Sequence, residues 1–200
     1  MTPDLVTELS ATAPTTARTA LAGRPTFDPT TFGPTAAGPS GPARATAARA
    51  PLTPAALSRI VRELAERPDR WIHHVRLSTK DRWYRRLAAD EDHEVWLISW
   101  LPGQSTGFHD HGGARGAFTV ALGELEELSL GGPERGLLVR RLPAGTARAF
   151  GPEYVHDVRN TATGPAVTLH AYSPPLSSMA HYELRAGGLV RTSEEGPEQW

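Results

Sequence analysis

The stretch that decides the fold is residues 103–123, GQSTGFHDHGGARGAFTVALG, which centres on His109-Asp110-His111. Successive side chains of a strand point to opposite faces, so an extended chain places both histidines on one face and Asp110 on the other. Two imidazoles about 7 Å apart along a strand can contact one metal ion. The prolines and glycines around them mark turns on both sides. The spacing therefore predicts a pair of metal ligands bounded by turns.

Short apolar runs dominate the sequence from residue 83 onward, where the helical period gives way to an extended one. The predicted strands cover residues 94–100, 117–122, 125–130, 136–142, 166–172 and 181–186. Turns that contain Gly, Pro or Asn separate these runs, and no helical pattern lies between them. This organisation is typical of an all-β protein, a sandwich or small antiparallel barrel. Small barrels carry their sites in the barrel mouth.

One amphipathic helix is predicted ahead of the strands, in TPAALSRIVRELAERP (residues 53–68). Thr53 is placed to cap the helix, and Pro54 occupies the first position, where a missing N–H costs nothing. Pro68 ends the pattern, and a further short helical turn follows it. The apolar residues at helical spacing are Leu57, Ile60, Val61 and Leu64.

The composition divides the chain into three parts. Residues 1–50 are rich in Ala, Thr, Pro and Gly, and half of the 18 prolines precede residue 55. Such a segment buries too little apolar surface to offset the entropy of ordering, so a disordered leader is expected. The domain is expected over residues 51–186, and residues 187–200 are expected to form a C-terminal tail.

Charge and cysteine content exclude several classes of function. A net charge of −1 argues against nucleic acid or an anionic membrane as a partner. The absence of cysteine excludes disulfides, thiolate metal sites and cysteine nucleophiles, so nitrogen and oxygen must hold any metal. The N-terminus lacks a basic region followed by an apolar run, and no stretch is long enough to span a bilayer. A cytoplasmic protein is therefore expected.

Two further segments carry candidate site residues. GPEYVHDVRN (151–160) supplies His156, a third metal ligand if its strand lies across the barrel from His109 and His111. In AVTLHAYSPP (166–175), alternation separates an apolar face from a polar one. A polar row inside an apolar barrel needs a reason for its burial, which favours a functional role. The polar face consists of Thr168, His170 and Tyr172.

A cluster of arginines surrounds Tyr84 in DRWYRRL (81–87). A guanidinium group matches a carboxylate with two parallel hydrogen bonds, so the cluster is a candidate anion clamp. A solvated basic edge would have the same pattern, and the sequence alone leaves both interpretations open. The arginines concerned are Arg82, Arg85 and Arg86.

Together these segments resemble the cupin superfamily and, within it, the thiol dioxygenases of the cysteine dioxygenase type. The first cupin motif combines a glycine, His-x-His, a glutamate and a second glycine. The matching residues are Gly103, His109, His111 and Gly123, with Gly116 at the place of the glutamate. The second motif is similar to Pro143-Ala144-Gly145 and to the segment from His156 to Asn160. The resemblance covers residues 53–185 and implies a cupin fold, a small barrel or jelly roll.

The resemblance also implies a metal site and the residues around it. Cysteine dioxygenase-like cupins lack the glutamate and bind Fe(II) with three histidines, which here would be His109, His111 and His156. Their Ser-His-Tyr row is similar to Thr168, His170 and Tyr172, with a hydroxyl retained in place of serine. WYRRL resembles the family's Tyr-x-Arg segment, which implies that Tyr84 and Arg86 hold the substrate carboxylate. Arg86 is preferred over Arg85 because Leu87 follows it.

The implied reaction is the oxidation of L-cysteine by O2 to cysteine sulfinic acid, a step of cysteine catabolism, by a protein that is expected to be a monomer. The Cys–Tyr cross-link of animal members is impossible here, since Gly116 stands at the position of the cysteine. Four alternatives stay open: a dioxygenase of 3-mercaptopropionate, another cupin enzyme using zinc, nickel or manganese, a non-catalytic metal- or ligand-binding cupin, and a barrel with incidental histidines.

Overall fold

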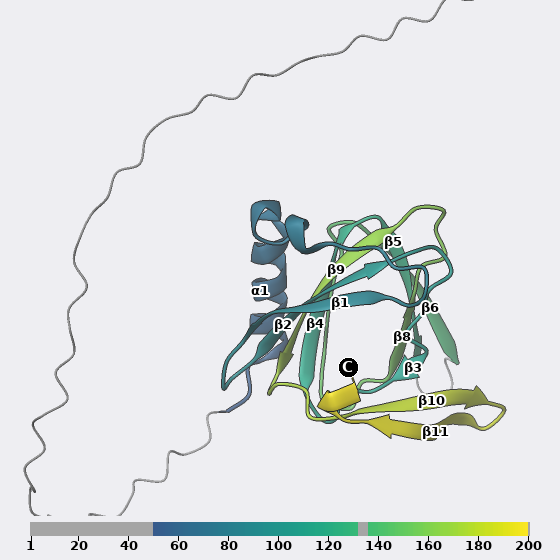
Figure 1. Cartoon of the computed structure of the whole chain (residues 1–200). Helices are drawn as coiled ribbons and strands as arrows, with labels where there is room; N and C mark the ends of the chain where they lie inside the picture. The colour runs from purple at the N-terminus through teal and green to yellow at the C-terminus, as the bar shows by residue number, and fades with distance from the viewer. Residues whose placement is uncertain (1–49, 132–135, 200) are drawn as a thin grey trace, which may run out of the picture. The chain divides into compact units, whose positions relative to one another are not determined.

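Two antiparallel sheets face each other and enclose a barrel (Figure 1). The computed structural model describes residues 50–131 and 136–199, so the predicted leader lies outside the described residues apart from residue 50. One sheet has the strand order β1 (Trp83–Ala89), β2 (Glu94–Trp100), β9 (Ala166–Ser173), β4 (Arg115–Leu122) and β7 (Ala147–Phe150). The other has the order β11 (Gly188–Glu195), β10 (Met179–Arg185), β3 (Phe108–His109), β8 (His156–Arg159), β5 (Glu124–Leu130) and β6 (Leu137–Pro143). The prediction of an all-β antiparallel barrel is confirmed.

The predicted helix packs against the outside of the first sheet. It is α1 (Pro54–Ala65), and the Thr53 side chain accepts a hydrogen bond of 3.2 Å from the backbone N–H of Ala56. Leu57 and Val61 are fully buried in one core with residues of β4 and β9, and α1 lies along these two strands (Figure 1). Two short 3₁₀ helices follow, η1 (Pro68–Arg70) and η2 (Ile72–His74), so the helical start of the domain is as predicted.

Two apolar cores lie on the two sides of β9, all of whose residues are buried. Val167, Leu169 and Ala171 belong to the core between the sheet and α1. Tyr172 belongs to the core between the two sheets, together with Trp100 and Phe118. Alternation along β9 therefore directs Thr168, His170 and Tyr172 into the barrel, as predicted.

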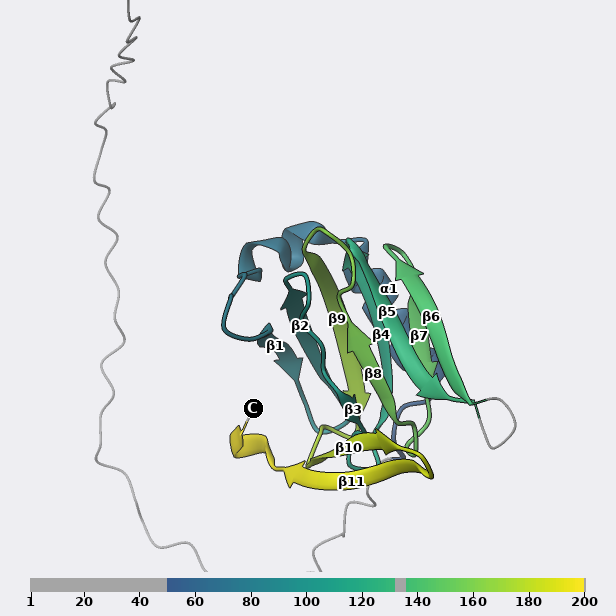
Figure 2. The same ribbon diagram turned by 90° about the vertical axis from the view of Figure 1, so that its right-hand side faces the viewer.

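Five strands were not predicted from the sequence: β1, β3, β7, β8 and β11. Three of them span only two to four residues, which is too short for a period to show. β11 and the 3₁₀ helix η3 (Pro197–Gln199) lie in the segment assigned to a C-terminal tail. β11 pairs antiparallel with β10, and the two strands run across one end of the barrel in Figure 2. The sheet thus continues about nine residues beyond the predicted domain boundary.

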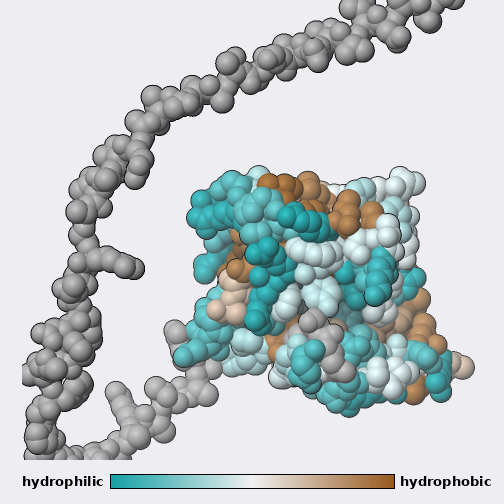
Figure 3. Space-filling model, viewed as in Figure 1, coloured by the Kyte–Doolittle hydropathy of each residue, from teal (hydrophilic) through white to brown (hydrophobic). Residues whose placement is uncertain are grey.

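The exposed apolar side chains are distributed over several elements. Hydrophilic residues predominate on the face in Figure 3, and hydrophobic residues gather along its upper edge and at the lower right. Among the described residues, no helix combines the length and apolar character needed to cross a bilayer.

Candidate metal centre and active site

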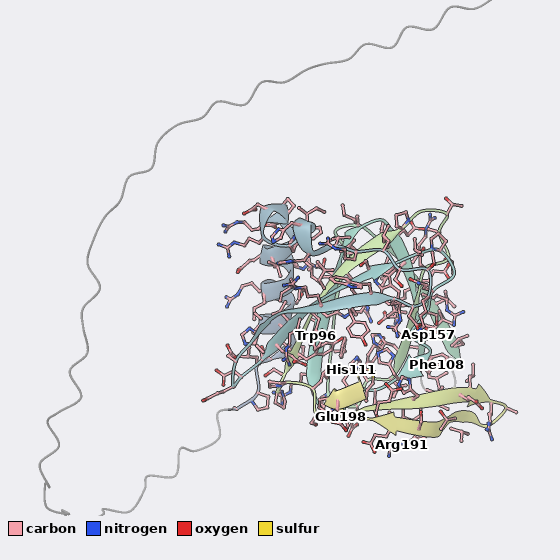
Figure 4. The ribbon with its side chains drawn as sticks, in the orientation of Figure 1. Trp96, Phe108, His111, Asp157, Arg191 and Glu198 are labelled. Atoms are coloured by element: carbon pink, nitrogen blue, oxygen red, sulfur yellow. The ribbon has the colours of Figure 1, made fainter. Side chains whose placement is uncertain are left out.

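Three buried histidines from two neighbouring strands meet inside the barrel. His109 ends β3, His156 begins β8, and the two residues are direct cross-strand partners. His111 follows β3 and projects into the same space (Figure 4). The ring centroids lie 4.9 Å (His109–His111), 4.8 Å (His109–His156) and 5.1 Å (His111–His156) apart. One ring nitrogen from each residue lies within 4.8 Å of the others, so the structure brings the three predicted ligands together.

The state of these rings fits a bound metal ion. Burial lowers the pKa of His109 and of His111 well below the usual value, and neighbouring histidines lower it further. Neutral imidazole is the form that binds metals. His109 donates from Nδ1 to the Gly107 carbonyl at 3.0 Å, which leaves Nε2 as its free ligand atom. Both ring nitrogens of His111 are buried without a hydrogen-bond partner, as expected of a residue that awaits a metal.

Gly116 leaves no room for a carboxylate ligand on the facing strand. A Cβ atom at this position would overlap the ring of Phe150, which itself stacks on His111 with a centroid distance of 4.6 Å. The donor set is therefore three nitrogens. Such a set would suit Fe(II) or Zn(II).

A hydrogen-bonded row runs along the inner face of β9 beside the histidines. Trp100 donates from its indole nitrogen to the Thr168 hydroxyl at 2.9 Å. His170 lies 2.8 Å from Thr168 through Nε2 and 3.1 Å from the Tyr172 hydroxyl through Nδ1. Tyr172 also stacks on His111, with ring centroids 5.2 Å apart. The structure therefore joins the three predicted row residues directly to the metal centre.

Donors and acceptors can be assigned to the hydrogen bonds along the row. The Thr168 oxygen already accepts from Trp100, and its distance to His170 Nε2 is 2.8 Å against 3.5 Å to the Ile98 carbonyl. The shortest distances are satisfied when Thr168 donates to His170 Nε2 and His170 Nδ1–H donates to the Tyr172 oxygen. Burial lowers the pKa of His170 to about 3, which keeps the ring neutral, and burial raises the pKa of Tyr172. The Tyr172 O–H is left to donate into the cavity.

Two pockets that share lining residues lie beside the histidines, and we call them the inner and the outer part of the cavity. Its inner part is lined by His109, His156, His170 and Tyr172, and its outer part, of about 120 Å³, is lined mainly by apolar side chains. Arg82 lines both parts. The other residues that line both parts are Ile98, Tyr172, Met179 and His181, while Tyr84, Trp96, Leu176 and Glu195 line only the outer part.

The arginine at the cavity is Arg82 and not the predicted Arg86. The Arg82 guanidinium lies over the Trp100 ring, 5.4 Å from its centroid, and burial lowers its pKa. Arg86 instead lies over Trp96 at 5.5 Å and 3.4 Å from the buried carboxylate of Glu94, and its side chain is 56% exposed. The Glu94 contact holds Arg86 at the rim, away from the cavity lining. Arg85 is exposed on the opposite face of β1.

Three residues at the site were not singled out from the sequence. Glu127 on β5 bonds to His156 at 3.0 Å, and His181 and Glu195 lie in the outer cavity wall. Burial alone would raise the pKa of Glu127, but His156 and Arg148 hold that pKa below its usual value. The available signal for Glu127 was a charge at an inward-facing strand position, next to the apolar Leu125 and Leu128.

Comparison with known proteins gives the family. The model of the cysteine dioxygenase type I family matches residues 49–185. Cysteine dioxygenase type 1 from Danio rerio is 29% identical over 116 residues, which cover 52% of this chain and 58% of that protein. The chain thus spans little more than half the length of this curated relative.

Similar solved structures include an uncharacterised protein with a double-stranded β-helix domain from Klebsiella pneumoniae (TM-score 0.46, 22% identity, 61% of this chain and 93% of that chain). They also include an RmlC-like cupin protein from Desulfovibrio desulfuricans (TM-score 0.44, 21% identity, 51% and 91%). The family match covers most of the chain, including all three histidines and the β9 row. This protein therefore belongs to the cysteine dioxygenase type I family and is a cysteine dioxygenase-type cupin.

Proposed function

We propose that this protein is an iron-dependent thiol dioxygenase that oxidises L-cysteine to cysteine sulfinic acid. The observation that carries the proposal is a pocket lined by Arg82, His109, His156, His170 and Tyr172, beside which lie the third buried histidine, His111, and the Thr168 end of the row. Bound Fe(II) would supply the redox chemistry that joins dioxygen to sulfur. In the overall reaction both oxygen atoms are added to the thiol sulfur, so sulfur is oxidised and O2 is reduced without a further co-reactant.

Arg82 is the residue that we propose for binding the substrate carboxylate. Among the described residues no carboxylate or carbonyl accepts a hydrogen bond from its guanidinium, which leaves the donors available to a ligand. A guanidinium group binds a carboxylate through two parallel hydrogen bonds. Stacking on Trp100 fixes the plane of the group. Tyr84 is at the same cavity and is proposed as the second contact to this end of the substrate.

Tyr172 is proposed as the hydrogen-bond donor to the reacting end of the substrate. His170 and Thr168 act through it, because they fix its oxygen as an acceptor within the row and leave its proton free for the cavity. Because burial raises the pKa of Tyr172, its phenol stays neutral at physiological pH and can donate a hydrogen bond in each turnover. The apolar Ile98 and Met179 in the cavity wall limit the access of water to the sulfur.

Oxygen uptake with product mass tests the proposal. Fe(II)-loaded protein given L-cysteine is expected to consume one O2 per cysteine and to release a product that has gained two oxygen atoms. Cysteamine, which lacks the carboxylate, serves as the matched substrate, and Zn(II)-loaded protein serves as the redox-inert control. Uptake with 3-mercaptopropionate but not with cysteine would change the substrate and keep the chemistry. Iron bound without uptake for any thiol would contradict a dioxygenase and favour a binding protein.

His109→Ala tests the metal ligands in the same preparation. This variant is expected to lose iron and oxygen uptake together, because two imidazoles hold a divalent ion far more weakly than three. Iron content equal to that of the unmodified protein would contradict the assignment of His109 as a ligand.

A further inference from the structure

The three histidines of the proposed metal site differ in the partners of their rings. The Nδ1 atom of His109 donates to a backbone carbonyl, and His111 makes no hydrogen bond from either ring nitrogen. His156 alone bonds to a carboxylate, with 3.0 Å between its Nδ1 and Glu127 Oε1. The metal centre is thus asymmetric, although its donor atoms are chemically identical.

Glu127 is fixed so that one of its carboxylate oxygens, Oε1, faces His156. The residue is fully buried in the middle of β5, and its backbone pairs with Val158 on β8 and Arg140 on β6. Its Oε2 accepts from Arg148 Nε at 2.7 Å, while Oε1 accepts from the Tyr154 hydroxyl at 3.1 Å and from His156. A buried carboxylate requires such partners, and together they prevent any other rotamer from being satisfied.

We infer that Glu127 is a positioning residue for the metal centre. It holds His156 as its Nδ1–H tautomer, directs Nε2 at the metal and makes this ligand the most electron-rich of the three. The inference rests on the proposed metal site. A carboxylate that accepts from Nδ1 selects the neutral tautomer whose lone pair lies on Nε2, the atom that would bind the metal. It also increases the basicity of the ring.

Glu127 would then supply from behind His156 the negative charge that a carboxylate ligand supplies in other cupin sites. The position of that ligand is taken by Gly116, where Phe150 leaves no space for a side chain. Two arginines contact the other carboxylate oxygen, Oε2: Arg148 at 2.7 Å and Arg140 at 3.9 Å, so the oxygen that faces His156 is the one without an arginine. The effect falls on metal affinity and on the spectrum of a bound ion, and not on substrate contacts.

Replacement of Glu127 by Gln tests the inference through metal binding alone. If the amide oxygen faces His156, its NH2 opposes Arg148; if the NH2 faces His156, it favours the wrong tautomer. Outer partners of metal-bound histidines typically contribute about 10- to 100-fold in affinity, so this loss is expected for Zn(II) and for Fe(II) under anaerobic conditions. The absorption bands of Co(II)-loaded protein are expected to shift as well. Equal affinity and an unchanged Co(II) spectrum would overturn the inference.

Glu124→Gln is the matched control. Glu124 lies on the same strand and forms an ion pair with Arg141 at 2.6 Å, but it is partly exposed and distant from the histidines along β5. The control is expected to keep the affinity of the unmodified protein. Failure of the unmodified protein to bind Zn(II) or Fe(II) would overturn the metal site itself, and so separates a failure of the proposed function from a failure of the role of Glu127.

A measurement on the unmodified protein covers the case in which the Glu127 variant does not fold. Two-bond ¹H–¹⁵N spectra of Zn(II)-loaded protein distinguish the two tautomers of each histidine. His156 is expected to carry its proton on Nδ1, with a downfield signal that exchanges slowly with water. A proton on Nε2 of His156, or a signal that exchanges at the rate of an exposed histidine, would overturn the inference.

Discussion

Tyr172 depends on two neighbours for the direction of its hydroxyl group. Replacement by Phe removes only that hydroxyl and keeps the ring stacked on His111. A hydrogen bond to a charged group contributes about 1.5–3 kcal/mol, so the turnover rate of Tyr172→Phe should fall about 10- to 100-fold. Iron content should stay the same, because Tyr172 is not among the ligand residues. Oxygen uptake and iron analysis of the same sample check both statements.

Thr168→Val is the companion variant for this prediction. It removes the hydroxyl that lies 2.8 Å from His170 Nε2, so the ring can take its other tautomer. A partial loss of turnover, smaller than that of Tyr172→Phe, is expected. Full activity in both variants would contradict a role for the row in the reaction.

Arg82 and Arg86 provide a pair of substitutions with different expected outcomes. Arg82→Met should raise KM for L-cysteine about 10- to 100-fold, since charged hydrogen bonds to the carboxylate are lost, and should leave KM for cysteamine unchanged. Arg86→Met should leave both KM values unchanged and lower the stability. The reason is that buried Glu94 then keeps only the backbone N–H of Leu176 as a partner, at 3.0 Å.

Steady-state kinetics with the two thiols and urea unfolding of both variants distinguish the arginines. A rise in KM for cysteine in Arg86→Met, with none in Arg82→Met, would restore the interpretation drawn from the sequence.

At the scale of elements, the two faces of β9 have different roles: one packs in the core and contributes to stability, and the other carries the residues of the site. Leu57 on α1 is fully buried against the apolar face, while the polar row and the metal centre lie on the other. Leu57→Ala should therefore lower the free energy of unfolding by about 2–5 kcal/mol. The oxygen-uptake rate per folded molecule should stay the same. Urea unfolding and activity at a temperature below the transition check the pair of expectations, and a proportional loss of activity would show that the helix also shapes the site.

The sequence predicts elements with a long and clear period. α1 follows from Thr53, Pro54 and its apolar stripe, and the inward row of β9 follows from strict alternation over eight residues. The three ligand histidines follow because His109 and His111 alternate on one short segment. β3 and β8 were missed, since two and four residues show no period.

Other features depend on pairing between segments that are distant in sequence. Which arginine reaches the cavity depends on how β1 pairs with β2, where Arg86 lies opposite Trp96 and the register shifts after Arg86. One sequence does not specify that shift. Glu127 acquires its role only when β8 brings His156 beside β5. β11 lies in a segment whose pattern resembles a polar tail, and only its pairing with β10 makes it part of the barrel.

At the scale of the whole molecule, metal binding and the stability of the fold both depend on the protonation of the buried histidines. Three histidines that line the barrel interior have lowered pKa values in the folded state: His109 and His111 well below 6.5, and His170 at about 3, all chiefly because burial disfavours the charged ring. In the unfolded chain their pKa returns to about 6.5. Between these values the unfolded chain binds protons that the folded chain does not, so unfolding takes up protons.

The stability of the metal-free protein is therefore expected to be full above pH 6.5 and to fall as the pH is lowered through this window, by about 1 kcal/mol per pH unit for each histidine that stays neutral. Proton uptake on unfolding near pH 5 should approach three, and His170→Gln should reduce it by about one. Zn(II) at about 1,000 times its Kd should add about 4 kcal/mol at pH 7, a gain that disappears as the ligands are protonated at lower pH. Urea unfolding at several pH values, with and without Zn(II), measures both effects. Stability that stays constant from pH 7 to pH 5 would mean that the buried histidines take up protons in the folded protein as they do in the unfolded chain, which would contradict the lowered pKa values.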